Sequence, residues 1–264
     1  MIYIDTHAHL YGEEFDRDRQ ETLERAKEAG VSRIILPDID STSRPAMLAL
    51  SETDPSYLFP LIGLHPTSVN ADYRPELREV VQQLGQRTFY GIGECGLDFY
   101  WDKTYYREQI KVFEYQLGIA RDARLPVVIH SRDALDEVFH SLEKYPELPG
   151  ILHCFPGNEE DARRACDRGL LLGIGGVVTF KNNSLASVIR KVGIQNLVLE
   201  TDAPYLAPVP YRGKRNESSY IPLIARKISE IAGEDVKKIA EITTQNAMNL
   251  FTLQSETTLP SGIR

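Results

Sequence analysis

The sequence has no long uninterrupted hydrophobic run, few cysteines and fewer positive than negative charges. No apolar stretch reaches the length of a bilayer-spanning helix, so we expect no membrane-spanning segment. The first residues carry neither the basic region nor the apolar core of a secretory signal, which predicts a soluble, cytoplasmic protein. The three cysteines have no C-x-x-C spacing and cannot all pair, which is typical of a reducing compartment.

The formal net charge of -8 argues against broad, non-specific wrapping of nucleic acid. It does not exclude an enzyme that binds a phosphate chain at one local basic site. A chain of 264 residues is long enough for one large α/β domain with a substantial core. Its composition is that of an ordinary globular protein.

Short apolar segments alternate with helical patterns along the chain. Strands are predicted at residues 2–9, 31–37, 57–65, 88–94, 125–130, 150–153, 170–175 and 197–202. Helices are predicted at residues 16–30, 43–53, 75–84, 103–123, 133–144, 158–168, 184–192, 219–231 and 235–250. This alternation predicts a single-domain α/β fold, a closed (β/α)8 TIM barrel with additional C-terminal helices. An open doubly wound sheet is the alternative. The domain is expected over residues 1–253, followed by a polar tail at 254–264.

The first predicted strand carries two histidines, His7 and His9. Side chains two positions apart on a strand point to the same face, so the two imidazoles are expected to project side by side. Paired neutral imidazoles form half of a site for a divalent metal ion. The alternative is a hydrogen-bonded histidine pair at a strand end.

Further candidate ligands follow later predicted strands, where a barrel of this kind carries its active site. These residues are Glu94, His130, His153 and Asp202. His, Glu and Asp together are typical ligands of a two-metal hydrolytic centre, in which the ions share an activated water. The alternative is a polar, hydrogen-bonded barrel mouth without metal.

We expect two divalent cations bridged by Glu94. One is predicted to lie on His7, His9, Glu94 and Asp202, and the other on Glu94, His130 and His153. A hydroxide shared by the ions is the predicted nucleophile, and Asp202 is placed to take its proton. The catalytic residues are therefore predicted to be Asp202 and Glu94.

Three more residues are predicted near this centre. Asp5 shares strand parity with His7, and Glu200 shares it with Asp202, so each is placed to orient a ligand; a salt bridge or hydrogen bond inside the barrel is the alternative. His65 ends the third predicted strand and is expected either to contact substrate or a ligand, or simply to pack.

The loop after the eighth predicted strand is rich in cations. Arg212, Lys214 and Arg215 are candidate phosphate contacts there, because phosphate sites in these barrels often involve the last loops. A solvated basic loop is the alternative. Tyr205 and the aromatic residues at 99–101 belong to loops at the same mouth and could stack nucleobases, although residues 99–101 could equally pack as a lid.

The motifs together resemble a known family. The matching segments are residues 4–10 (IDTHAHL), 63–66 (GLHP), 91–98 (GIGECGLD), 128–134 (VIHSRDA), 152–155 (LHCF), 179–182 (TFKN), 199–208 (LETDAPYLAP) and 212–217 (RGKRNE). They resemble the TatD-type metal-dependent deoxyribonucleases, a branch of the amidohydrolase-like barrel hydrolases. That branch has a glutamate where many relatives carry a modified lysine, and Glu94 fits it.

The resemblance implies hydrolysis of phosphodiester bonds in DNA, often as a 3′-to-5′ exonuclease that uses Mg²⁺ or another divalent ion. The predicted partner is DNA, through single-stranded 3′ ends, and the sequence indicates no protein partner. Zn²⁺, Mn²⁺ and Ni²⁺ also suit these ligands. Two alternatives stay open: an amidohydrolase or esterase such as an aminoacyl-tRNA deacylase, and a non-catalytic, metal-bound scaffold.

Overall fold

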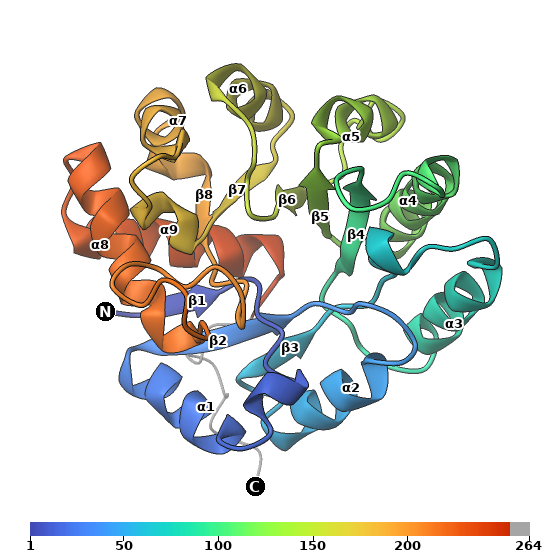
Figure 1. Ribbon diagram of the computed structural model, residues 1–264, viewed down its shortest axis with the longest axis horizontal. Helices are drawn as coiled ribbons and strands as arrows, with labels where there is room; N and C mark the ends of the chain where they lie inside the picture. Colours follow the sequence, from blue (N-terminus) through green and yellow to red (C-terminus); the bar gives the residue numbers. More distant parts are fainter. Residues whose placement is uncertain (254–264) are drawn as a thin grey trace, which may run out of the picture.

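A computed structural model describes residues 1–253 as a parallel barrel surrounded by helices (Figure 1). The strands are β1 (Tyr3–Asp5), β2 (Val31–Leu36), β3 (Leu58–Pro60), β4 (Ile92–Asp98), β5 (Val127–Arg132), β6 (Gly150–Leu152), β7 (Leu171–Ile174) and β8 (Leu197–Leu199). The α-helices are α1 (Arg19–Glu28), α2 (Arg44–Thr53), α3 (Arg74–Leu84), α4 (Tyr106–Ala123), α5 (Leu135–Leu142), α6 (Glu159–Asp167), α7 (Leu185–Val192), α8 (Ile221–Ala232) and α9 (Val236–Leu250).

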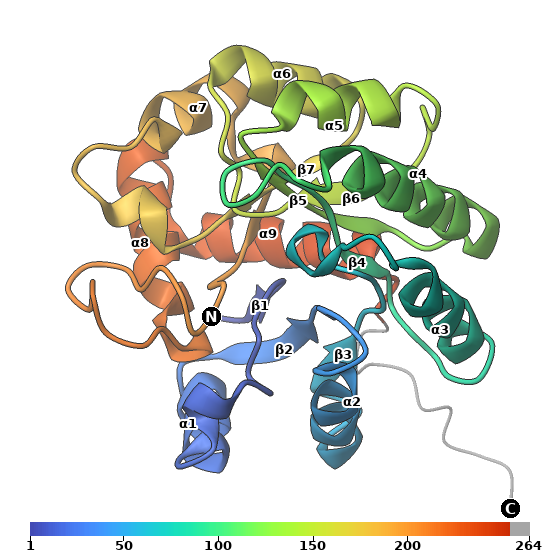
Figure 2. The same ribbon diagram turned by 45° about the vertical axis from the view of Figure 1, so that its right-hand side comes forward.

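All paired strands are parallel, in the orders β1-β2-β3 and β4-β5-β6-β7-β8. Two isolated parallel bridges join these sheets: Ile62 pairs with Ile92, and Ala8 pairs with Ala203. The order of strands around the ring therefore follows the order in the chain, and the helices lie outside it (Figures 1 and 2). The predicted TIM-barrel fold with an additional C-terminal helix is confirmed.

Helix boundaries follow local capping chemistry. At the start of α6 the Asn158 side chain accepts hydrogen bonds from the backbone of Glu160 and Asp161, and Asp161 accepts one from the Asn158 backbone. This capping box satisfies amide groups that a helix start leaves unpaired. At the other end of a helix, Gly233 follows α8 with a φ of 69°, a left-handed conformation that glycine adopts without strain.

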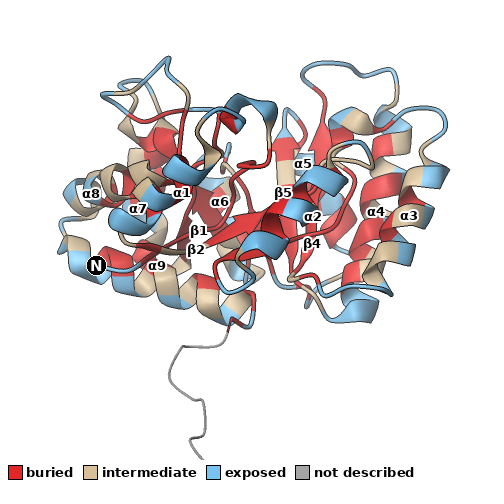
Figure 3. Cartoon of the chain, turned by 90° about the horizontal axis from the view of Figure 1, so that it is seen from below, coloured by how far each residue is buried: buried red, intermediate tan, exposed pale blue. Residues whose placement is uncertain are grey.

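The apolar core has two main parts and a smaller cluster of Leu64, Val69, Leu77 and Val112. The larger lies between the strands and the surrounding helices, whose inner faces are buried and outer faces exposed (Figure 3). The second lies inside the barrel and combines residues of β1, β2, β3, β5, β6 and β8 with Ala247 and Phe251 at the end of α9. The Asn246 side chain of α9 donates hydrogen bonds to the carbonyls of Gln195 and Leu197, at the start of β8. Thus α9 closes the amino-terminal end of the barrel and leaves its carboxyl end open.

Several predicted strand boundaries were wrong. β1 ends at Asp5 rather than at residue 9, and β3 covers Leu58–Pro60 rather than residues 57–65. β4 begins at Ile92 and extends to Asp98, whereas residues 88–94 were predicted. The ladder with β5 begins where Ile92 pairs with Val127, because the preceding Pro126 has no N–H to donate. Glu94 and His130 consequently lie within strands rather than after them.

Within residues 1–253, no helix is both long enough and apolar enough to cross a membrane. The predicted polar tail at residues 254–264 lies outside the described part of the chain.

Candidate metal centre

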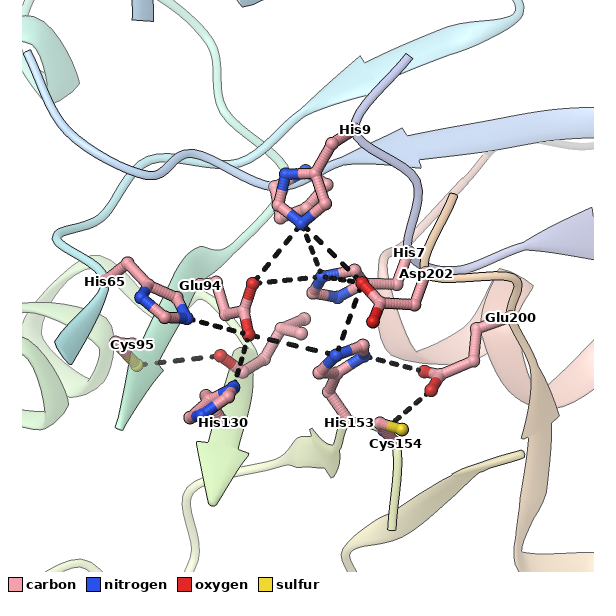
Figure 4. A network of polar contacts seen from close by, with 12 residues as sticks. His7, His9, His65, Glu94, Cys95, His130, His153, Cys154, Glu200 and Asp202 are labelled. Carbon is pink, nitrogen blue, oxygen red and sulfur yellow. Dashed lines mark hydrogen bonds and ion pairs between the residues drawn. The ribbon is translucent and has the colours of Figure 1, made fainter. Parts of the chain in front are cut away.

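The open carboxyl end of the barrel contains a cavity of about 450 Å³. It is lined by His9, Ile39, His65, Thr67, Glu94, His130, Ser131, Arg132, His153, Cys154, Pro156, Asp202, Tyr205 and Leu206. Five imidazoles and two carboxylates that are distant in the sequence converge there or directly beside it (Figure 4). The convergence follows from the parallel topology, because the carboxyl ends of all strands meet at one rim.

Glu94 lies at the middle of this cluster and is almost completely buried. Its Oε2 atom lies 3.1 Å from His7 Nε2 and 3.5 Å from His9 Nε2. Its Oε1 atom faces three other imidazoles, at 2.8 Å from His130 Nδ1, 3.3 Å from His65 Nε2 and 3.8 Å from His153 Nε2. One carboxylate thus has its two oxygens directed at two different groups of imidazoles.

Asp202 approaches the same cluster from the segment after β8. Its Oδ1 atom lies 3.8 Å from the Nε2 atoms of His7, His9 and His153. The side chains form three sets in which all candidate ligand atoms lie within 4.8 Å of one another. These sets are His7, His9 and Glu94; His7, His153 and Asp202; and His65, Glu94 and His130. The first set matches part of the predicted first ion position. The last set shares Glu94 and His130 with the predicted second ion position. It contains His65, whereas His153 was predicted there.

The donor chemistry of these residues fits divalent cations. The Nε2 atoms of His7 and His9 are only 3.2 Å apart, and both face carboxylate oxygens of Glu94 and Asp202. Neutral imidazole nitrogens and carboxylate oxygens are the ligands that Zn²⁺, Mn²⁺ and related ions take in proteins. The Nδ1 atom of His7 is also buried without a hydrogen-bond partner, as expected of a cluster organised around something other than hydrogen bonds alone.

Two glycines allow the backbone to approach these side chains. A Cβ atom at Gly96 in β4 would lie 2.0 Å from the carbonyl oxygen of His130 in β5. A Cβ atom at Gly173 in β7 would lie 2.2 Å from Oε2 of Glu200. Any larger residue at either position would push a strand or a carboxylate away from the centre.

The cluster strongly shifts the pKa values of its members when no cation is bound. Burial would raise the pKa of Glu94, but the surrounding imidazoles hold it well below its ordinary value. Burial alone would lower the pKa of His130, yet hydrogen bonds with Asp98 and Glu94 raise it to about 9. The pKa of His153 is raised to about 10 because Glu200, Glu94 and Asp202 outweigh burial. Without metal, His130 and His153 therefore carry protons at neutral pH.

Metal binding is expected to release these protons, because a nitrogen that binds a cation cannot remain protonated. The apparent affinity for a divalent ion should fall as pH falls from 8 to 6, by about 100-fold per pH unit if both protons leave. Calorimetric titration in buffers of different ionisation enthalpy measures the number of protons released. Binding with no proton release, or with an affinity independent of pH, would contradict this electrostatic account.

Two of the imidazoles contact a further carboxylate. His130 Nε2 lies 3.0 Å from Asp98 Oδ2, and His153 Nδ1 lies 3.2 Å from Glu200 Oε2. Contacts of this kind orient a ligating imidazole. Asp98 was not singled out from the sequence as a site residue, although it lies four positions after Glu94 and so shares its strand parity.

Asp5 contacts backbone rather than an imidazole. Its Oδ1 atom accepts hydrogen bonds from the backbone N–H groups of His7 and Thr201 at 3.3 and 3.0 Å. Its Oδ2 atom accepts from the hydroxyls of Thr201 and Ser218, both at 2.6 Å. Asp5 therefore ties the segment after β1 to the segment after β8, and it acts on the ligands through their main chain.

Tyr11, which was also missed, fixes the proton on His9. The Tyr11 hydroxyl donates to the carbonyl oxygen of Pro37 at 2.7 Å, and burial raises its pKa well above the ordinary value. His9 Nδ1 lies 2.8 Å from the same hydroxyl oxygen. Since the hydroxyl proton is engaged with Pro37, His9 must donate from Nδ1, which leaves the Nε2 lone pair directed at the centre. The alternation that pairs His7 with His9 extends to Tyr11.

Replacing Tyr11 by phenylalanine is expected to weaken divalent-metal affinity by roughly 10- to 100-fold, because His9 loses its orienting partner. Competition with a fluorescent chelator measures this change directly. Tyr57→Phe is the matched control, since Tyr57 is buried and its hydroxyl has no hydrogen-bond partner. Equal affinities in the two variants would contradict the role of Tyr11.

The residues predicted to contact substrate fall into two groups. His65 and Tyr205 line the cavity. Arg212 lies outside that lining, with its guanidinium 4.4 Å from the ring of Phe180 in a neighbouring depression. The Lys214 ammonium lies 6.0 Å from the ring of Tyr211. These two cations are exposed and lie on the segment after β8.

Arg215 is engaged elsewhere. Its guanidinium pairs with Asp18 at 2.6 Å and donates to the carbonyl oxygen of Glu14. Asp18 precedes α1, so Arg215 fastens its loop to the barrel wall. The phosphate contact of this residue stays a prediction, although two of its guanidinium nitrogens already serve other contacts.

A closed parallel barrel with buried histidines and carboxylates converging at its carboxyl end is the architecture of a metal-dependent hydrolase. A family model described as "TatD related DNase" matches residues 4–252. The chain belongs to the TatD family of metal-dependent hydrolases.

Individual relatives agree with this assignment. The chain is 39% identical over 254 residues to a protein of Bacillus subtilis named "Uncharacterized metal-dependent hydrolase YabD", with 95% of this chain and 99% of the relative covered. It is 33% identical over 259 residues to a Pectobacterium parmentieri protein named "3'-5' ssDNA/RNA exonuclease TatD", covering 95% and 99% of the two chains. The crystal structure of the TatD homologue YJJV from Escherichia coli superimposes with a TM-score of 0.89 at 30% identity, covering 96% of this chain and 98% of that one.

Proposed function

We propose that this hydrolase cleaves phosphodiester bonds of DNA, as a 3′-to-5′ exodeoxyribonuclease acting on single-stranded ends. The observation that carries the proposal is the position of Glu94, whose two oxygens face separate groups of imidazoles at the bottom of an open cavity. That arrangement suits two divalent cations bridged by one carboxylate. The name of the Pectobacterium relative, a single-stranded DNA and RNA exonuclease, supports nucleic acid as the substrate class.

Two groups of residues would hold the two cations, one group at each oxygen of Glu94. His7 and His9 would hold one cation with Oε2 of Glu94, and His130 would hold the other with Oε1. His153 and Asp202 complete the cluster from the β6 and β8 side. Divalent cations here would activate water and neutralise the negative charge that develops on phosphate. Mg²⁺ is the expected ion in activity, while Zn²⁺, Mn²⁺ and Ni²⁺ also suit these donors.

The protein supplies a proton acceptor and substrate contacts. Without metal, burial raises the pKa of Asp202 to about 6 in spite of His153 and His9. Asp202 is the carboxylate beside the cluster other than the bridging Glu94, which makes it the candidate general base. Its contacts with the imidazoles all involve Oδ1, so the proton is received at Oδ2. Arg212 and Lys214 at the rim provide positive charge for phosphates of the entering strand.

The test is digestion of single-stranded oligonucleotides labelled at either the 5′ or the 3′ end, across a series of divalent metals. With metal, mononucleotides should leave from the 3′ end, and addition of a chelator should stop the reaction reversibly. The bound metal is measured in parallel by elemental analysis. Absence of cleavage with every divalent ion would remove the proposal, and mononucleotides leaving from the 5′ end would reverse the assigned polarity.

A variant separates phosphodiester cleavage from cleavage of a neutral amide or ester. Arg212→Ala should lower kcat/KM for an oligonucleotide by about tenfold, because a charge-assisted phosphate contact is lost. It should leave hydrolysis of an uncharged ester unchanged. Arg226→Ala on α8 is the control, since Arg226 is also an exposed arginine but lies on an outer helix. An equal effect of both variants would contradict a phosphate contact at Arg212.

A further inference from the structure

Two large aromatic side chains stand exposed immediately after β4. Tyr100 is 54% exposed and Trp101 is 70% exposed. Of the 23 aromatic residues, 11 are buried and only five are exposed, and isolated exposed ones need no explanation. These two are adjacent, with ring centroids 5.0 Å apart and an interplanar angle of 86°. They form an aromatic surface that contributes little to the core.

Arg132 connects this surface to the metal centre. It is the last residue of β5 and lines the cavity that contains Glu94 and His130. Its guanidinium carbon lies 3.9 Å from the ring centroid of Tyr100 and 5.0 Å from that of Trp101. A cation beside exposed aromatic rings is the combination that proteins use for single-stranded nucleic acid, because bases stack on the rings and phosphates pair with the cation.

Asp98 holds the aromatic surface at a defined position relative to the centre. Its Oδ1 atom accepts hydrogen bonds from the backbone N–H groups of Tyr100 and Trp101 at 3.0 and 3.4 Å. Its Oδ2 atom lies 3.0 Å from His130 Nε2. One carboxylate therefore anchors both the turn that presents the rings and a candidate metal ligand.

We propose that Tyr100, Trp101 and Arg132 form a nucleobase-stacking subsite, which binds a nucleotide adjoining the one at the metal centre. The inference rests on the proposed function for its substrate, a single-stranded nucleic acid. Stacking of this kind is tolerant of base identity, since every base has a π face. The subsite therefore favours an unpaired strand over a duplex, in which the faces of the bases are already stacked.

The amino-acid composition provides a direct probe, because Trp101 is the single tryptophan of the chain. The full-length protein, kept metal-free with chelator so that no hydrolysis occurs, is titrated with a short oligothymidylate. Stacking on the indole should quench its fluorescence saturably. An abasic oligonucleotide of the same length and charge should quench far less. Equal quenching by the two oligonucleotides, or none by either, would overturn the subsite.

Kinetics give an independent readout. Trp101→Ala should lower kcat/KM for the oligonucleotide by roughly 5- to 150-fold, mainly by raising KM, which is the range for loss of one stacked base. Hydrolysis of a mononucleotide nitrophenyl ester, which has no adjoining base, should be unchanged. Trp101→Phe should retain most of the activity because it keeps a ring. Tyr115→Ala is the control, since Tyr115 is 51% exposed but lies on α4.

The two proposals fail in different ways. If the wild-type protein cleaves oligonucleotides but Trp101→Ala has no effect beyond that of Tyr115→Ala, the subsite is wrong and the nuclease function stands. That result is expected if the rings of Tyr100 and Trp101 only pack within their own loop. If the protein cleaves no oligonucleotide while base-dependent quenching persists, the nuclease function fails and a nucleotide-binding surface remains.

Discussion

Replacing Asp202 by asparagine should reduce the rate of hydrolysis by roughly 10²- to 10⁴-fold, the range expected when a general base is removed. Asparagine keeps the size of the side chain and one oxygen at the position that faces His7, His9 and His153 at 3.8 Å. It cannot accept a proton. The loss is therefore expected in kcat, with little change in bound metal.

The measurements are steady-state kinetics on a single-stranded oligonucleotide and elemental analysis of the purified variant. Asp136→Asn is a suitable control, because the Asp136 side chain is 91% exposed on α5. A metal-bound scaffold without catalytic activity predicts that Asp202→Asn changes nothing. A rate within tenfold of the wild type would remove Asp202 as the proton acceptor. Loss of metal together with activity would assign Asp202 to binding instead.

Much of this centre was predictable because strand alternation and strand order are simple rules. His7 and His9 lie two apart, and Glu94, His130 and His153 each occur in or after a short apolar run. A parallel barrel brings such positions to one rim whatever the details of each strand. Errors of several residues in strand boundaries therefore did not displace the candidate ligands.

Other features depend on contacts between distant segments, and local sequence patterns do not specify these partners. Arg215 looked like a phosphate contact within a basic loop, yet Asp18 pairs with it from the start of α1. The role of Tyr11 depends on the carbonyl of Pro37, which directly follows β2. Likewise, the orientation of Asp98 toward His130 follows from the pairing of β4 with β5. Pairings of this kind arise only from the assembled fold.

Glu94→Gln should abolish measurable hydrolysis, with a loss of roughly 10³-fold or more, because it removes the one charge common to both groups of imidazoles. Glutamine preserves shape and one carbonyl oxygen, but its amide nitrogen cannot bind a cation. In the wild type, Oε1 lies 2.8 Å from His130 and Oε2 lies 3.1 Å from His7. In the variant, an N–H₂ group that donates hydrogen bonds replaces one of these two oxygens. The metal content should fall to one ion or none.

Thermal denaturation separates loss of metal from loss of fold. A cation that binds only the folded state raises the midpoint of wild-type unfolding, and this rise should largely disappear in Glu94→Gln. The control is Glu114→Gln on α4, which breaks the ion pair with Lys144 far from the cavity and should keep both metal and activity. If Glu94→Gln retained two ions and its rate, the carboxylate would not be the bridge. The two groups of imidazoles would then have to bind cations independently, and the shared-water chemistry would lose its structural basis.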